Sequence, residues 1–334
     1  MSAGSSPPPL WVSVIIPVRD KAAYVPECVG SVADAVAATP DAELIIVDNG
    51  STDGSRELCE ALVRGPVRLI DSSGTIAHVR NTGAGAARGE WLYFIDCDCV
   101  VPRDLLTRLR IVARDPAVSV TGCRVDYPLD RSWIERTWHL MHSREGDGER
   151  SYLNSGNFAL RRAAFEAVGG FDESLVTGED AEIGARLRRA GHQVHERRSL
   201  AITHLDNPHD IPAFFKKEVW RGLGAGGTSR GLAIDRPTAF AVLNVLLNAA
   251  AVVLLVATGP SVRTLMLAFG LVVVMPAVAV VARWLSVRRG FNFAQAVLLY
   301  WVYLIARAWA LMRIALAPGK DAAARNKGAD ETTR

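Results

Sequence analysis

The sequence EWLYFIDCDCVVP, residues 90–102, contains a short apolar run that ends in two carboxylates one residue apart. Residues 91–95 have the length and the apolar character of a buried central strand in a parallel sheet. Asp96 and Asp98 follow that run directly. Ligands of open α/β sheets bind at the carboxyl ends of strands, where carboxylates can hold a divalent cation beside an anionic ligand. The triplet alone is more typical of a solvated turn than of a metal site, so its meaning depends on the rest of the chain.

Strand and helix patterns alternate before this stretch. The apolar, β-branched runs have the composition of buried strands, and the segments between them carry apolar residues at helical spacing or end in a glycine stop. This alternation predicts a doubly wound, mostly parallel α/β sheet. We expect strands at 11–17, 43–47, 67–70 and 91–95, and helices at 21–38, 55–64 and 78–89.

The pattern continues less regularly after residue 102. Residues 126–150 are polar with scattered aromatics and no clear period, so we interpret them as a mobile substrate loop. The segment SGNFALRRAAF predicts a turn, a strand and a helix. We also expect helices at 102–114 and 178–190, a strand at 118–124, and edge strands at 193–196 and 200–205.

Composition divides the 334 residues into unlike parts. Residues 239–257 and 265–282 contain no charged side chain and are each close to the length that crosses a bilayer. A pair of buried soluble helices is the alternative, although two such runs joined by a short loop are unusual in a soluble core. We expect a disordered lead-in at 1–10, a globular domain at 11–212, a basic, Gly-rich connector at 213–238, a membrane region at 239–316 and a charged tail at 317–334.

The flanks of the apolar runs carry more basic residues than the loop between them, where Arg263 stands alone. By the positive-inside rule both outer flanks are cytoplasmic, and the absence of a signal-peptide pattern at the start of the sequence leads to the same expectation for the globular domain. The third apolar segment, 294–316, contains Arg307 and Arg313. Because arginine within a span is costly, we favour an interfacial or re-entrant segment over a third span.

Cysteine usage and charge exclude several classes of protein. The five cysteines show no paired spacing of a zinc site and are typical of free thiols in a reducing compartment. Cys97 and Cys99 alternate with the two acids, but hard cations prefer oxygen ligands, so we interpret them as packing residues. The net charge of +3 is spread along the chain and argues against a nucleic-acid partner.

Five motifs occur in a fixed order: VSVIIPVRD, IIVDNGSTDGS, HVRNTGAGAARGEWLYFIDCDC, SGNFALRRAAF and GFDE followed by GEDAEIGARLRRAG. In this order they resemble the inverting family 2 glycosyltransferases of the glycosyltransferase-A fold. The likeness covers roughly residues 12–205, and the apolar tail resembles family members that act on lipid-linked or membrane-delivered acceptors. The Gln-x-x-Arg-Trp motif of processive synthases is missing, which argues against synthesis of long polymers.

The resemblance implies a nucleotide-sugar donor site. Pro17 and its neighbours would line it, Asp48 would meet the base or ribose, and Asp53 and Arg80 would lie close by. These types suit the task, since carboxylates accept from a base N–H or ribose hydroxyls and an arginine fork fits a diphosphate. Turn capping is the alternative for Asp48 and Asp53, and a surface ion pair is the alternative for Arg80.

The resemblance also implies a metal site. Asp98 would ligate Mg²⁺ or Mn²⁺ against the diphosphate, and Asp96 would contact the ribose or a metal-bound water. A histidine often completes such sites in the family. His204, at the end of an expected strand, is the candidate, with His209 as its competitor.

The family pattern places the catalytic base in GEDAE. Asp180 would take the proton of the acceptor hydroxyl during a single inverting displacement. A helix cap is the alternative, because carboxylates are favoured at helix N-termini. The remaining residues expected around the sugar and acceptor are Glu179, Asn154, Gly156 and Asn157.

These features predict a membrane-anchored, metal-dependent, inverting glycosyltransferase with its catalytic domain at the cytoplasmic face of the inner cell membrane. We expect a donor linked to UDP and a lipid-linked or glycan acceptor. A polyprenyl-phosphate sugar synthase is one alternative. A non-catalytic nucleotide-sugar-binding scaffold is an alternative of another class.

Overall fold

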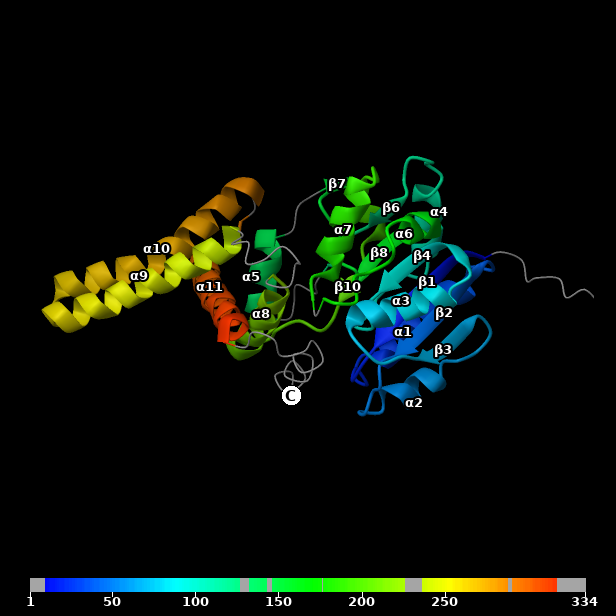
Figure 1. Cartoon of the computed structure of the whole chain (residues 1–334), viewed down its shortest axis with the longest axis horizontal. Helices are drawn as coiled ribbons and strands as arrows, with labels where there is room; N and C mark the ends of the chain where they lie inside the picture. Colours follow the sequence, from blue (N-terminus) through cyan, green and yellow to red (C-terminus); the bar gives the residue numbers. More distant parts are fainter. Residues whose placement is uncertain are drawn as a thin grey trace, which may run out of the picture. The chain divides into compact units, whose positions relative to one another are not determined.

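The computed structural model divides the chain into two compact units, which are described separately below (Figure 1). The first unit comprises Met1–Tyr127, Glu145–Ser174 and Gly178–Asp206, and the second comprises Pro128–Arg144, Leu175–Thr177 and Asn207–Arg334. The structure describes residues 10–126, 132–142, 146–175, 177–225, 236–287 and 290–316. The expected lead-in at 1–10 and the charged tail at 317–334 therefore lie almost entirely outside the described residues.

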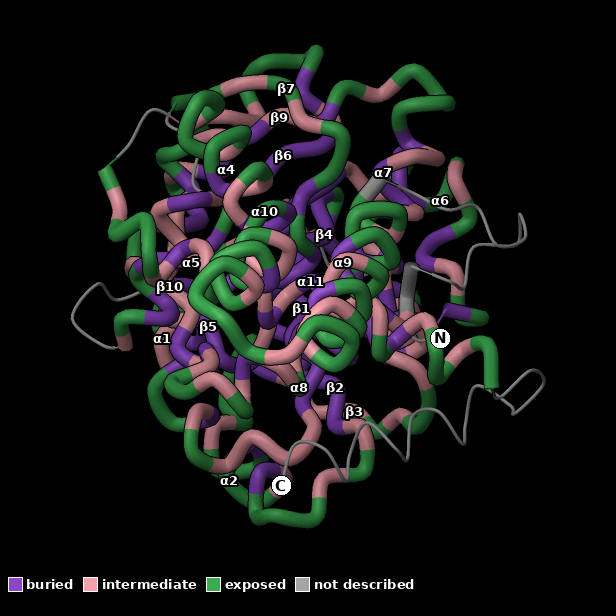
Figure 2. The backbone as a smooth tube through the Cα atoms, turned by 90° about the vertical axis from the view of Figure 1, so that its left-hand side faces the viewer, coloured by how far each residue is buried: buried purple, intermediate pink, exposed green. Residues whose placement is uncertain are grey.

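An eight-stranded sheet forms the centre of the first unit, in the order β3-β2-β1-β4-β8-β6-β9-β7. β1, β2, β3 and β4 are mutually parallel, β8 is antiparallel to both β4 and β6, and β7 is antiparallel to β9. Figure 2 shows the inner strands as largely buried. The predicted mostly parallel sheet is confirmed. The strands are β1 (Leu10–Val18), β2 (Ala42–Asp48), β3 (Val67–Asp71), β4 (Gly89–Ile95), β6 (Val120–Gly122), β7 (Gly148–Arg150), β8 (Asn157–Arg161) and β9 (Val194–Glu196).

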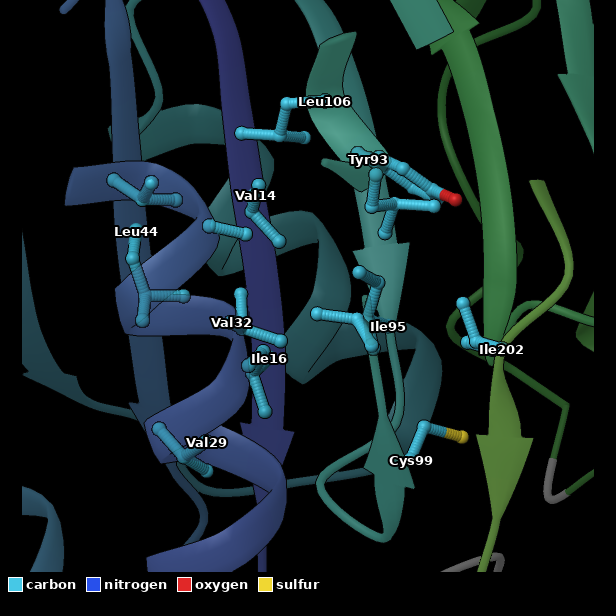
Figure 3. Close-up of a cluster of buried hydrophobic side chains, with 14 of the residues drawn as sticks. Val14, Ile16, Val29, Val32, Leu44, Tyr93, Ile95, Cys99, Leu106 and Ile202 are labelled. Carbon is cyan, nitrogen blue, oxygen red and sulfur yellow. The ribbon is translucent and has the colours of Figure 1, made fainter. Parts of the chain in front are cut away.

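Helices cover both faces of this sheet because successive strand residues point to opposite sides. Val14 and Ile16 of β1 pack with Val29 and Val32 of the first helix, as Figure 3 shows, whereas Ile15 belongs to the core on the other face. α1 (Val25–Ala37), α2 (Ser55–Glu60) and α4 (Leu105–Val112) contribute to the first core, and α3 (Ile76–Ala86), α6 (Arg162–Ala167) and α7 (Glu179–Arg189) contribute to the second.

The Ala- and Gly-rich composition of α3 has a packing reason. A Cβ added to Gly83 would lie 2.4 Å from Cγ2 of Ile15 in β1, so a larger residue would push the helix off the sheet. This close approach fixes α3 against β1 and β2. The residue that α3 contributes to the site, Arg80, lies one turn earlier.

A buried carboxylate near the amino ends of the strands ties several elements together. Glu43 accepts hydrogen bonds from the Ser13 hydroxyl at 2.8 Å and from the backbone N–H of Arg88 at 2.8 Å. The guanidinium groups of Arg88 and Arg68 pair with its other oxygen at 2.9 and 3.2 Å. This cluster stabilises the fold at the end of the sheet opposite to Asp48 and Asp96.

A second, two-stranded sheet follows the Asp96–Asp98 turn. β5 (Cys99–Val100) pairs antiparallel with β10 (Thr203–His204), so that His204 lies opposite Cys99. The expected strand at 200–205 is therefore shorter than predicted, because a 3₁₀ turn, η1 (Arg198–Leu200), precedes it. The expected edge strand at 193–196 is also placed differently, since β9 lies between β6 and β7 inside the main sheet.

The second unit is helical. Its helices are α5 (Trp133–His142), α8 (Ile211–Ala225), α9 (Arg236–Thr258), α10 (Val262–Val287) and α11 (Phe293–Leu316), and the last three pack side by side (Figure 1). Pro237–Thr258, Val262–Val287 and Phe293–Leu316 are each long and apolar enough to cross a membrane. The expected spans at 239–257 and 265–282 fall inside the first two.

Two expectations for this part of the chain need correction. The interpretation of 126–150 as a mobile loop is wrong for α5, whose Ile134 is buried against Phe214 and Leu299. The aromatic residues of that segment are thus part of a helix core. The connector expected at 213–238 begins with α8, which packs against α11 through Val219 and Ala306, and its residues 226–235 lie outside the described residues. The first compact unit ends at Asp206, and the domain boundary expected at residue 212 stays a prediction.

Arg307 in α11 has partners. Its guanidinium lies 4.0 Å from the buried carboxylate of Glu218 in α8 and 5.2 Å from the centre of the Tyr303 ring. A paired arginine is less costly in an apolar helix than an isolated one. Arg307 alone therefore does not exclude a membrane-spanning α11, and the interfacial placement of α11 stays a prediction.

Candidate active site

Asp98 and His204 lie together at the carboxyl end of β4. Nε2 of His204 is 3.2 Å from Oδ1 of Asp98, and the two side chains are 15% and 10% exposed. Backbone pairing fixes this approach, because β10 runs beside β5 and the N–H of Leu205 donates to the carbonyl of Asp98 at 2.8 Å. His204 thus lies beside Asp98, and their role as metal ligands stays a prediction.

Cys99 joins these two residues in a group whose potential ligand atoms lie within 4.8 Å of one another. Burial raises the pKa of the Cys99 thiol well above its ordinary value, and the Asp98 carboxylate adds to that effect. The thiol is therefore neutral, and its side chain lies in the core beside Ile202 (Figure 3). The oxygen of Asp98 and the nitrogen of His204 suit a divalent cation such as Mn²⁺, with further ligands from water or phosphate.

Lys21 contacts the other oxygen of Asp98, with Nζ 3.2 Å from Oδ2. The same ammonium pairs with Oδ2 of Asp206, whose Oδ1 accepts a hydrogen bond from the Tyr24 hydroxyl at 3.3 Å. Burial opposes the charge of Lys21, but Asp98 and then Asp206 outweigh it and raise the pKa of Lys21 above its ordinary value. Lys21 and Asp206 were not predicted as site residues.

The turn after β1 holds Lys21 in place. Its backbone N–H donates to the Ser55 hydroxyl at 2.7 Å, and the N–H of Ala22 donates to Asp53 at 2.9 Å. Asp20 adopts a positive φ of 48° and accepts from the N–H of Thr52 at 2.8 Å. The segment NGSTDGS thus fixes the backbone that follows β1 through these hydrogen bonds. Asp53 has an evident structural role here, and its contact with a donor stays a prediction.

Arg80 joins the end of β4 to the start of α7. Its Nη2 donates to Oδ1 of Asp96 at 2.7 Å, and its Nη1 donates to Oε1 of Glu179 at 2.6 Å. Arg80 is 3% exposed and Glu179 is 7% exposed, so this is a buried ion pair rather than the surface pair considered above. Asp96, bound to Arg80, is not a member of the Asp98, Cys99 and His204 group.

Asp180 follows Glu179 in the first turn of α7. Burial and the neighbouring Glu179 carboxylate raise the pKa of Asp180 to about 6. Its Oδ1 accepts a hydrogen bond from the N–H of Ala181 at 2.7 Å, so it does not cap the helix start in the usual way. A carboxyl group with this pKa is ionised at neutral pH and is a competent proton acceptor.

The turn before β8 approaches Asp96 closely. A Cβ on Gly156 would lie 2.6 Å from Oδ2 of Asp96, and the N–H of Gly156 donates to Oδ1 of Asn154 at 2.7 Å. Asn157 is fully buried: its Oδ1 accepts from the Tyr93 hydroxyl at 2.6 Å and its Nδ2 donates to the carbonyl of Leu200 at 2.8 Å. The side chain of Asn157 therefore has a structural use, and Gly156 sets the space beside Asp96.

Pro17 and Asp48 lie at the carboxyl ends of β1 and β2. Pro17 is two residues beyond the last pair between β1 and β4, Ile15 with Phe94, so its missing N–H costs no ladder bond on that side. Asp48 is 3% exposed, and its carboxylate accepts from the N–H of Ser51 at 3.3 Å. This is the turn-capping use of Asp48 that was open from the sequence, and its contact with a donor base stays a prediction.

His209 belongs to the second unit and lies 3.8 Å from Glu135 in that unit. His204 is thus the histidine that the structure places at Asp98. Two signals could have led to the residues that were missed. Lys21 follows the carboxyl end of β1, where ligands of such sheets bind, and Asp206 lies two residues from His204.

Comparison with known families finds a match within the first unit. Residues 13–169 match the family described as Glycosyl transferase family 2. The match includes Asp98 but ends before Asp180 and His204, so the roles of these two residues rest on the structure and on the sequence resemblance. Most of the matched residues belong to the first unit, which contains the central sheet.

Relatives of this chain include a glycosyltransferase and a succinoglycan biosynthesis protein. Glycosyltransferase AglE of Haloferax volcanii is 28% identical over 192 residues, covering 55% of this chain and 63% of that protein. Succinoglycan biosynthesis protein ExoA of Rhizobium meliloti is 27% identical over 234 residues, covering 64% of this chain and 67% of that protein. The chain therefore spans about two thirds of each relative.

A solved structure shares the fold. Mannosyltransferase PcManGT from Pyrobaculum calidifontis, in complex with GDP-Man and Mn²⁺, superposes with a TM-score of 0.58 over 89% of this chain and 86% of that one. The sequence identity is 18%, so this likeness concerns the fold alone.

Proposed function

We propose that this chain, which carries a glycosyl transferase family 2 domain, moves a sugar from a nucleotide-sugar donor to an acceptor at a membrane. One arrangement carries the proposal. Asp98 and His204 form a pair suited to a cation, and Asp96, two residues before Asp98, is connected through Arg80 and Glu179 to the segment that bears Asp180. A potential diphosphate site and a potential base thus belong to one network.

Asp98 and His204 would hold Mg²⁺ or Mn²⁺. When bound, the cation neutralises charge on the departing nucleoside diphosphate. PcManGT, a protein of the same fold, was solved with Mn²⁺ and a nucleotide sugar, which supports a cation and a nucleotide-sugar donor here. Asp96 would contact the ribose, and Asp48 would contact the base or ribose at the end of the neighbouring strand. We expect a UDP-linked donor.

Asp180 would act as the base of a single inverting displacement. The acceptor oxygen forms a bond to the anomeric carbon, the bond from that carbon to the diphosphate oxygen breaks, and the acceptor proton goes to Asp180. A carboxyl group with a pKa of about 6 suits this step, because it is ionised at neutral pH and still accepts a proton readily. Arg80 would hold the carboxylates of Asp96 and Glu179 in place through its two hydrogen bonds.

The raised pKa of Asp180 also favours one acceptor class. A hydroxyl needs a base when it attacks, whereas a polyprenyl phosphate is already ionised and needs none. We therefore infer a hydroxyl of a lipid-linked or glycan acceptor, rather than a lipid phosphate. Three helices long enough to span a bilayer support delivery of that acceptor by the membrane. The basic flanks of the first two support a catalytic domain on the cytoplasmic side of the inner membrane.

Release of nucleotide from a panel of UDP-, GDP- and dTDP-sugars tests the proposal. The full chain in detergent is assayed with glycan and lipid-linked acceptors, with Mn²⁺ or with chelator. Asp98→Ala should abolish release, whereas Asp104→Ala, a change of an exposed aspartate just before α4, should not. Metal-independent turnover that Asp98→Ala leaves unchanged would contradict the assigned site. Nucleotide binding without turnover on every donor and acceptor would favour the scaffold alternative.

A further inference from the structure

Lys21 contacts the carboxylate that a divalent cation at Asp98 and His204 would also bind. Its ammonium lies 3.2 Å from Oδ2 of Asp98, while Oδ1 of the same carboxylate faces His204 at 3.2 Å. The side chain of Asp98 is 10% exposed and that of Lys21 is 27% exposed, so the carboxylate is largely shielded from water and the ammonium is partly shielded. A dication on Asp98 would strongly repel an ammonium group at this distance. A bound cation and Lys21 would therefore weaken each other's hold on this carboxylate.

Asp206 gives Lys21 a second attachment. It pairs with the same ammonium, and the Tyr24 hydroxyl orients it from the other side at 3.3 Å. The backbone of Lys21 is fixed separately by its hydrogen bond to Ser55 at 2.7 Å. The four-carbon side chain can thus release Asp98 while its charge stays at the site.

The charges of the site point to what Lys21 meets next. Asp98 and Asp206 carry two negative charges and Lys21 one positive charge, which leaves the group net negative. Addition of a dication makes it net positive, and this favours an anion next to the cation. With a nucleotide-sugar donor that anion is the diphosphate, which an ammonium recognises as a compact point charge.

We propose that Lys21 competes with the divalent cation for Asp98 and, once displaced, binds the diphosphate of the donor while Asp206 holds it at the site. Lys21 is then a donor-binding residue that also tunes cation affinity, and Asp206 is its positioning residue. The inference rests on the proposed function, because it assigns the diphosphate of that donor as the second partner of Lys21.

Two binding measurements test the two halves of this inference on the full chain in detergent. Mn²⁺ is titrated without nucleotide, and then UDP and GDP are titrated at saturating Mn²⁺. Lys21→Met removes the charge and keeps most of the length of the side chain. We expect about tenfold tighter Mn²⁺ binding and about tenfold weaker binding of the diphosphate, the scale of one charged hydrogen bond. Lys216→Met, at an exposed position of α8, should change neither affinity.

The positioning role of Asp206 is tested by its effect on the competition between Lys21 and Mn²⁺. Asp206→Asn leaves Lys21 with Asp98 as its remaining carboxylate partner among the described residues, so we expect weaker Mn²⁺ binding than in the wild type. In the double variant Lys21→Met/Asp206→Asn the competitor is gone, and Mn²⁺ affinity should return to within about threefold of Lys21→Met alone. Thermal unfolding of each variant checks that the fold is retained.

Several results would overturn the inference. Unchanged or weaker Mn²⁺ binding in Lys21→Met contradicts competition, and unchanged affinity for both diphosphates contradicts the donor contact. A double variant as weak as Asp206→Asn would make Asp206 a ligand of the cation itself. Because these measurements use binding alone, they fail or succeed independently of the transfer assay that judges the proposed function.

Discussion

The pH dependence of transfer should report the ionisation of Asp180. The carboxyl group lies in the first turn of α7, beside Glu179, and burial together with that neighbour raises its pKa from an ordinary 3.8 to about 6. A base must be ionised to accept a proton, so activity should fall as pH decreases through this value. The acidic limb of the profile is therefore a direct consequence of where Asp180 is placed.

The magnitude follows from the ionised fraction. With a pKa of about 6, Asp180 is roughly nine-tenths ionised at about pH 7 and roughly one-tenth ionised at about pH 5, so the rate should drop about tenfold. With an ordinary aspartate pKa the same change of pH would lower the rate by less than about a tenth. The two cases are easily distinguished.

The assay is the initial rate of nucleotide release at saturating donor, cation and a hydroxyl acceptor, because a phosphate acceptor would itself titrate in this range. Glu179→Gln keeps an oxygen that can accept from Arg80 but removes the neighbouring negative charge. It should shift the acidic limb to lower pH. A flat profile between about pH 5 and about pH 7, or a limb that Glu179→Gln leaves in place, would refute the role of Asp180.

Three further changes give separate tests. Gly156→Ala should reduce transfer at least about tenfold with little change in unfolding temperature, because the added methyl would lie 2.6 Å from the Asp96 carboxylate. Gly85→Ala is the control, since nothing lies within 4 Å of a Cβ at that position. Equal activity of the two variants would contradict the assigned contact. His204→Ala should weaken Mn²⁺ binding at least about tenfold in a titration, whereas His209→Ala should not, and the reverse order would exchange their roles. Glu43→Gln should destabilise the fold by about 1–3 kcal/mol in denaturant unfolding. Burial favours the neutral form of Glu43, but hydrogen bonds from an arginine outweigh it and lower the pKa of Glu43. The stabilisation that ionised Glu43 adds to the fold is therefore fully present above about pH 4.3 and is lost as pH falls through the folded-state pKa. A difference in unfolding free energy between Glu43→Gln and the wild type that does not depend on pH would contradict this.

Much of the fold could be predicted because the central strands are buried on both faces. Residues 91–95 and 43–47 are apolar runs bounded by turn residues, and both are strands in the structure. The two uncharged runs are likewise helices long enough to span a membrane. Residues 133–142 were missed because α5 buries few apolar residues of its own and packs against α11, more than a hundred and fifty residues later in the chain.

Candidate site residues could be predicted from the sequence only where a single local motif contains them. Asp98 could be assigned from a strand end, and His204 from the family pattern. Their mutual distance depends on the pairing of β5 with β10, two strands of two residues each that have no periodic signal. The pairing of Arg80 with Asp96 and Glu179, and of Lys21 with Asp206, joins positions 16, 99 and 185 residues apart. Such contacts follow from the tertiary structure and from no local pattern.

The central claim is that a cation site at Asp98 and a base at Asp180 act together in sugar transfer. Asp180→Asn keeps the size of the side chain and removes its ability to accept a proton, so donor binding and transfer can be measured on the same preparation. The account predicts donor affinity within about threefold of the wild type and a loss of transfer of at least about a hundredfold. Full transfer by Asp180→Asn, with the donor bound as in the wild type, would contradict it.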